Sequence, residues 1–162
     1  MTTRTRLALA IAAIIPALGA APRAHADDQK LYIGALCQEN SLGETGAFLR
    51  NEAYITRVVN AGNGRLICPV TTDNAGGVRT RIAVTDTNTG ADISCSVSVR
   101  NSDGSPAAFQ TRFSTGSAGF QFISPEVTSS FSGLPRSVEC IMPVNGSNGI
   151  TLIHSMLVTE LF

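Results

Sequence analysis

The 162-residue sequence holds 12 basic and 12 acidic side chains, and its formal net charge is zero. A chain without a basic excess supplies no electrostatic field to hold a polyanion, so we expect no nucleic-acid partner. The sequence contains two tyrosines and no tryptophan. Sugar-binding modules commonly stack sugar rings on these side chains, so their scarcity weakens the case for carbohydrate binding.

The first 26 residues are predicted to be a signal peptide. Arg4 and Arg6 begin it, an apolar run follows from Leu7 to Leu18, and Ala24-His25-Ala26 fits a small-x-small cleavage site. The apolar run is shorter than the roughly 20 residues that a transmembrane helix needs, which disfavours the alternative of an uncleaved anchor. We therefore expect a single mature domain over residues 27–162, secreted or periplasmic, with no transmembrane segment.

The early part of the mature chain is the hardest to assign. Leu31 to Cys37 and Arg65 to Val70 are predicted to be strands. Between them, Ala47 to Asn60 fits either a strand or a helix, and we favour the strand.

Two segments alternate cleanly between apolar and polar residues. Val78 to Asp86 directs its apolar side chains to one face and Arg79 and Arg81 to the other, and Asp92 to Arg100 opposes a cysteine and valines to serines. Period two of this kind indicates a strand with one face in the core. The turn-rich link between the two segments predicts that they pair as a hairpin.

Further strands follow in the second half. Ala107 to Thr115 and Gly119 to Ser124 are predicted to form a second pair, and Val127 to Phe131 a short strand. Arg136 to Met142 alternates, with Val138, Cys140 and Met142 predicted to face inward.

The terminal segment, Ile150 to Phe162, is predicted to be a long strand that is apolar on both faces. Leu152, Met156 and Val158 would share one face with Ile150, and Ile153, Leu157 and Leu161 the other. Such a strand is covered on both sides or sits at an interface, so self-association through it is one hypothesis.

Eight or nine short antiparallel strands predict an all-β fold, namely a two-sheet antiparallel β-sandwich, with a closed barrel as the alternative.

The four cysteines all follow the predicted cleavage point, and an even number in an exported chain predicts two disulfides. Cys95 and Cys140 lie on the inward faces of their strands, so we favour Cys95–Cys140 with Cys37–Cys68; the other pairings stay open. Wide cysteine spacing makes a zinc site unexpected.

Two motifs qualify as candidate sites. His154 would be a general base for Ser155 or Ser147, but no G-x-S-x-G motif supports a hydrolase elbow, and we favour a strand histidine packed beside Met156 or exposed at an edge. The string Asp86, Asn88, Gly90, Asp92 resembles a calcium loop. Gly90 and Val97 stand where oxygen ligands belong, so a polar turn is favoured, and we expect no catalytic residue, no metal and no cofactor.

Surface charge suggests one further site. Arg79 and Arg81 share an outward face, and if Arg100 lies nearby on the next strand, the three would form a patch for an anion or an acidic glycan. The favoured alternative is a solvated sheet face. The carboxylates are scattered along the chain: Glu39, Glu44, Glu52, Asp103, Glu126, Glu139 and Glu160.

Several short elements together resemble a group of small, uncharacterised exported bacterial proteins with four cysteines. They are Asn60, Cys68-Pro69, Val84 to Asp86, Cys95, Cys140 with Pro143, and Ile150 to Glu160. The resemblance implies secretion and a β-sandwich, and it implies no site residue.

The sequence therefore predicts an exported, non-enzymatic structural or binding module whose specific partner is unknown. The alternative is a hydrolase that acts on an extracellular polymer through two of the scattered carboxylates.

Overall fold

The computed structural model describes residues 28–40, 48–58, 63–72, 76–116, 118–128, 134–145 and 149–161, and the predicted signal peptide lies outside them. No helix in the described part of the chain is long and apolar enough to cross a membrane. One short 3-10 helix, η1 (Gly34–Leu36), accompanies the strands. The strands are β1 (Gln29–Ile33), β2 (Gln38–Glu39), β3 (Phe48–Arg50), β4 (Ile55–Arg57), β5 (Gly64–Pro69), β6 (Gly77–Asp86), β7 (Ser94–Arg100), β8 (Pro106–Phe113), β9 (Gly119–Ile123), β10 (Glu126–Thr128), β11 (Arg136–Met142) and β12 (Thr151–Leu161).

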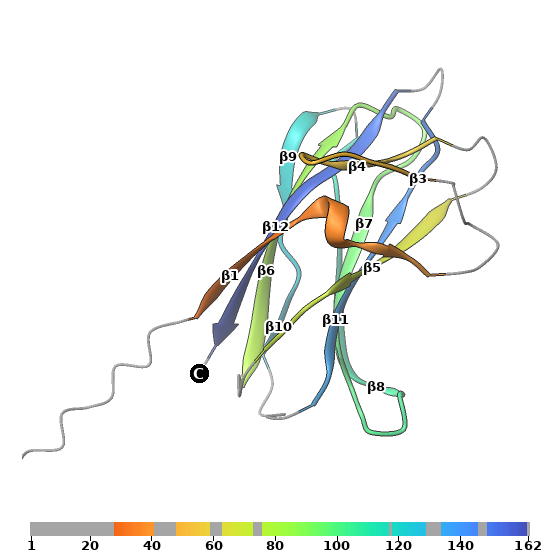
Figure 1. Cartoon of the computed structure of the whole chain (residues 1–162). Helices are drawn as coiled ribbons and strands as arrows, with labels where there is room; N and C mark the ends of the chain where they lie inside the picture. The colour runs from red at the N-terminus through yellow and green to blue at the C-terminus, as the bar shows by residue number, and fades with distance from the viewer. Residues whose placement is uncertain are drawn as a thin grey trace, which may run out of the picture.

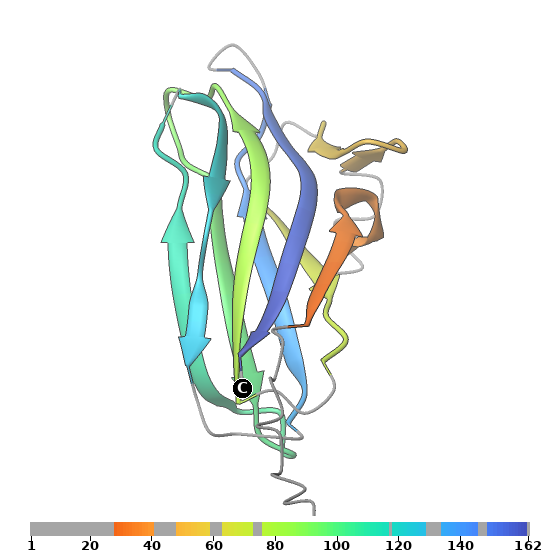
Figure 2. The same cartoon turned by 90° about the vertical axis from the view of Figure 1, so that its left-hand side faces the viewer.

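The strands form two antiparallel sheets, which confirms the predicted β-sandwich (Figure 1). Sheet A is built on the long pair β6 and β12. On its edge away from β12, β6 pairs with β9 and β10. On its edge away from β6, β12 pairs with β1 and β4, and β3 lies beyond β4. Figure 2 shows β9 and β10 following one another along the sheet edge. Sheet B has the order β2-β5-β11-β7-β8. The described residues thus contain twelve strands rather than eight or nine.

The core lies between the sheets and uses the inward faces that alternation predicts. Val78, Ile82 and Val84 of β6 are almost fully buried, as are Val97 of β7 and Val138 of β11. Burying each such side chain contributes about 1.5–3 kcal/mol.

The predicted hairpin of 78–86 with 92–100 is wrong, because β6 belongs to sheet A and β7 to sheet B. The buried Asp86 carboxylate ends β6 and accepts hydrogen bonds from the backbone N–H groups of Asn88 (2.9 Å) and Ile93 (3.2 Å). These bonds satisfy the backbone of a link that crosses the sandwich, where a hairpin would have used cross-strand bonds.

The second predicted pair is wrong in the same way, because β8 pairs with β7 in sheet B and β9 pairs with β6 in sheet A. Ser114, just after β8, also donates its hydroxyl to Asp86. One buried carboxylate therefore fixes both crossings between the sheets.

The terminal strand forms as predicted, but its faces differ from those expected. A register shift between Ile153 and Ser155 leaves His154 as an extra residue in β12. Such a bulge reverses the alternation beyond it. Ile153, Met156 and Val158 consequently face the core together.

The uncertain segment 47–60 is neither one strand nor a helix, because its described part is the hairpin β3–β4. The Asn51 side-chain oxygen accepts hydrogen bonds from the backbone N–H groups of Ala53 and Tyr54, both at 2.8 Å. An Asx turn of this kind ends β3 and reverses the chain.

The disulfides join Cys95 to Cys140 and Cys37 to Cys68, the pairs favoured from the sequence. Cys95 and Cys140 are register partners on adjacent strands of sheet B, with Cα atoms 4.1 Å apart. Cys37 lies where the chain leaves η1 for β2, so its bond to β5 fastens the passage from sheet A to sheet B.

Candidate functional site

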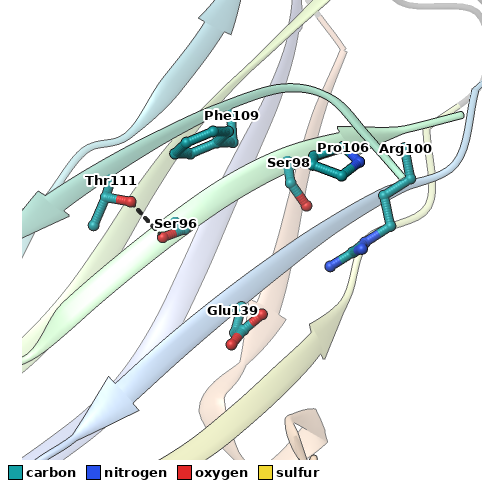
Figure 3. Close-up of a pocket in the computed structure, with 7 residues that line it drawn as sticks. All are labelled: Ser96, Ser98, Arg100, Pro106, Phe109, Thr111 and Glu139. Carbon is teal, nitrogen blue, oxygen red and sulfur yellow. Dashed lines mark hydrogen bonds between the residues drawn. The ribbon is translucent and has the colours of Figure 1, made fainter. Parts of the chain in front are cut away.

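An open cleft of about 220 Å³ lies on the outer face of sheet B. It crosses three neighbouring strands, β11, β7 and β8 (Figure 3). Its lining residues are Ser96, Ser98 and Arg100 of β7, Pro106, Phe109 and Thr111 of β8, and Glu139 of β11.

The hollow follows from the residue types on the middle strand. Because β7 alternates, its cysteine and valines enter the core and its serines face outward. Ser96 stands between Glu139 and Thr111 in the sheet register, and Ser98 stands opposite Phe109. Small side chains between larger ones leave a groove along β7.

Hydroxyl groups line the floor of this cleft. The Ser96 and Thr111 hydroxyls lie 2.7 Å apart, and the Ser98 hydroxyl lies 3.0 Å from that of Ser137. A hydroxyl both donates and accepts, so each pair retains capacity for a further polar partner.

One wall is aromatic and the other is charged. Phe109 is 69 % exposed although it is a large apolar side chain. On the β11 side, Glu139 forms an ion pair with Arg65 at 2.8 Å. The cleft therefore combines an exposed ring with hydroxyls and charged groups, which is suited to a ligand with both apolar and polar surfaces.

His154 lies on the other sheet, in an aromatic cluster on the outer face of sheet A. Its Nε2 hydrogen-bonds with the Thr85 hydroxyl at 2.8 Å, and its ring lies 6.1 Å from that of Tyr54 and 5.7 Å from that of Phe120. Burial lowers the pKa of the imidazole below its ordinary value. The histidine contacts a threonine and aromatic rings rather than Met156, which faces the core. Ser147, one of the two serines for which His154 was a candidate base, lies outside the described residues.

The calcium-like string is organised as a crossing link. Asp86 accepts backbone and hydroxyl hydrogen bonds, as described above, and the Asn88 side-chain oxygen accepts from the backbone N–H of Gly90 at 2.8 Å. Asp92 is exposed. Among the described residues, no group of three His, Cys, Asp or Glu side chains is arranged to hold a metal ion.

The scattered carboxylates are brought together only in part. Glu39 pairs with Arg50, Glu126 with Arg79, and the fully buried Glu160 with Lys30. Glu44 lies outside the described residues. Glu139 alone among the described acids lines the cleft, where glycoside hydrolysis needs two.

The proposed patch of three arginines does not form, because Arg79 and Arg81 are on sheet A and Arg100 is on sheet B. Arg79 pairs with Glu126 at 2.6 Å, and the Arg81 guanidinium lies 3.8 Å from the centroid of the Phe122 ring. Arg100 lines the cleft.

The sequence pattern does not identify Phe109, Ser96, Ser98 and Thr111 as site residues. The outward serines of the Asp92 to Arg100 segment were visible, but their partners across the cleft depend on strand pairing. The one sequence feature that points to the cleft is the row of small outward side chains on the strand of the inward cysteine. This row indicates where a groove would form, but it does not identify the residues that line the groove.

The sequence matches no protein-family model and no curated protein, whereas the fold is similar to several solved structures. One is a fragment of Clostridium thermocellum endo-1,4-β-D-xylanase 10B with its CBM22-1 and GH10 modules, complexed with xylohexaose: the TM-score is 0.55 and the identity 9 %, over 85 % of this chain and 28 % of that one. Another is Arthrobacter globiformis isomalto-dextranase complexed with panose, with a TM-score of 0.50 and 12 % identity, over 80 % of this chain and 23 % of that one. A family 35 carbohydrate-binding module from Clostridium thermocellum has a TM-score of 0.48 and 16 % identity, over 81 % of this chain and 98 % of that one.

The chain thus spans about a quarter of the length of the two enzyme structures. At these identities the similarity concerns the fold, a two-sheet β-sandwich.

Proposed function

We propose that the chain is an exported bacterial, non-enzymatic module that binds carbohydrate in the cleft of sheet B. The observation that carries the proposal is the exposed Phe109 ring beside a floor of hydroxyls. A sugar ring has an apolar face, which packs on an aromatic ring, and hydroxyls, which exchange hydrogen bonds with Ser96, Ser98 and Thr111.

Three further observations support the proposal. The cleft is open, so a chain longer than the cleft could enter and leave it. The fold is similar to parts of two solved structures, a xylanase with its CBM22-1 and GH10 modules complexed with xylohexaose and an isomalto-dextranase complexed with panose. Two disulfides fit an oxidising compartment, as the predicted signal peptide requires.

Phe109→Ala tests the site directly. Removing a central aromatic anchor should weaken binding to a glycan at least about tenfold. Isothermal titration calorimetry with xylohexaose, panose and a panel of plant and bacterial oligosaccharides measures the effect.

Phe113→Ala is the matched control, because Phe113 is 64 % exposed on the same face of β8 but does not line the cleft. Equal losses in both variants, or no binding to any glycan of the panel, would contradict the proposal. Release of reducing ends from the same glycans would favour the hydrolase instead.

We also propose that the chain self-associates through the outer face of sheet A. Leu31, Ile33, Phe120 and Phe122 are 44–70 % exposed there. The sheet register joins them across β12 and β6, since Ile33 pairs with Ser155, Ser155 with Ala83, and Ala83 with Phe122. Exposed apolar side chains gathered on one sheet face are typical of a protein interface.

Size-exclusion chromatography with light scattering tests this second proposal. The wild type should show a concentration-dependent mass above that of the monomer, and Phe122→Ser should reduce it, while Phe113→Ser on the other sheet should not. A strict monomer at all concentrations would remove the proposal without affecting carbohydrate binding.

A further inference from the structure

Arg100 differs from the other outward arginines in its surroundings. Arg79 has a carboxylate partner and Arg81 lies over an aromatic ring, both on sheet A. Arg100 ends β7 and lines the cleft, where Figure 3 shows its side chain together with those of the other lining residues.

The position of Arg100 is set by the turn that follows it. Its Nη1 donates a hydrogen bond to the Gly104 carbonyl at 2.9 Å. The Asn101 N–H donates to the Ser105 carbonyl at 2.8 Å and closes the turn. One N–H of the guanidinium is used in this way, and a guanidinium has five.

The carboxylates of the following turn and of the cleft wall have other partners. Glu139 pairs with Arg65, and Asp103 accepts hydrogen bonds from the Ser105 hydroxyl (2.6 Å) and backbone N–H (2.9 Å). Within the part of the chain that the structure describes, Arg100 forms no ion pair.

We infer that the glycan held in this cleft carries a carboxylate, as a uronic acid does, and that Arg100 binds it. The inference rests on the proposed carbohydrate binding. A guanidinium holds a carboxylate through two parallel hydrogen bonds, so a planar acid group on the sugar matches it better than a hydroxyl does. Phe109, across the cleft, would receive the apolar face of the same or the next sugar ring.

The test compares an oligogalacturonate with its methyl ester, which has the same chain without the charge. The wild type should bind the acid more tightly than the ester, and the difference should shrink as salt screens the charge. Arg100→Gln should weaken binding of the acid about tenfold, because a hydrogen bond to a charged group is lost, and should weaken binding of the uncharged ester much less.

Three further variants separate the explanations. Arg100→Lys keeps the charge without the two-pronged geometry and should fall between wild type and Arg100→Gln. Glu139→Gln removes a negative charge from the cleft and should raise affinity for the acid. Arg79→Gln, on the other sheet, is the matched control and should change nothing.

The two proposals fail in different ways. If Phe109→Ala abolishes binding but acid and ester bind equally and Arg100→Gln has no effect, the glycan is neutral and this inference is overturned while carbohydrate binding stands. If Phe109→Ala has no effect on any glycan, the cleft is not the site and both fail. Dextran sulfate binding that matches the oligogalacturonate in strength, and persists in Phe109→Ala, would show charge attraction alone and would also overturn the inference.

Discussion

At the scale of single residues, His154 gives the fold a pH dependence. Burial disfavours the charged imidazolium and lowers the pKa of His154 below the ordinary 6.5. The unfolded chain therefore binds this proton more readily than the folded chain does. The contribution of His154 to stability is complete above pH 6.5 and decreases as the pH falls below that value.

We therefore expect wild type to lose more stability than His154→Gln between neutral pH and about pH 5. Glutamine does not titrate, and its amide can still bond with the Thr85 hydroxyl. Urea unfolding of both proteins at the two pH values measures the difference. Parallel pH profiles would contradict this expectation, because they would show that the imidazole is as easily charged in the fold as in water.

At the scale of strands and links, Asp86 decides the topology. Its buried carboxylate contacts the link that leaves β6 and the residue that follows β8. Asp86→Asn replaces one acceptor oxygen with a donor amide, which leaves a buried N–H or hydroxyl facing another donor. We expect the free energy of unfolding to fall by about 2–3 kcal/mol.

Urea denaturation checks this expectation, with Asp103→Asn as the control because Asp103 makes similar local bonds in an exposed turn. The control should show little change. If Asp86→Asn is as stable as wild type, the link is held by its other contacts and the carboxylate does not fix the crossings.

Alternation along the chain predicts strands but not their partners. The inward faces of β6 and β11 follow from the order of valines and polar residues, and they form as expected. The passage from β6 to β7 in the other sheet involves instead one aspartate, Asp86, whose bonds to the link are formed only in the folded protein. Likewise, the extra residue at His154 reverses the faces of β12, and no feature of the sequence marks that bulge.

At the scale of the whole molecule, the cleft exists only through sheet order. Ser96, Phe109 and Glu139 lie on three strands that are neighbours in sheet B, although β11 is separated from β7 and β8 in the sequence by β9 and β10. Predicting their proximity required knowing that β7 lies between β11 and β8. The cysteines are more informative, because alternation predicts that Cys95 and Cys140 face inward, and the two are direct register partners on β7 and β11.

The same two disulfides should dominate the stability of the whole molecule. The bonds span 45 residues (Cys95–Cys140) and 31 residues (Cys37–Cys68). The loop-entropy model assigns roughly 3.5–4 kcal/mol to each, which is a large share of the net stability of about 5–15 kcal/mol that is typical of a small domain.

We expect Cys95→Ala/Cys140→Ala and Cys37→Ala/Cys68→Ala each to lower the unfolding free energy by about that amount, and the quadruple variant not to fold. Denaturant titration measures the two double variants and circular dichroism the quadruple one, after mass spectrometry has confirmed that the wild type has no free thiol. Four free thiols in the purified protein, or a loss below about 1 kcal/mol in both double variants, would mean that packing between the sheets holds the sandwich without the oxidised sulfur.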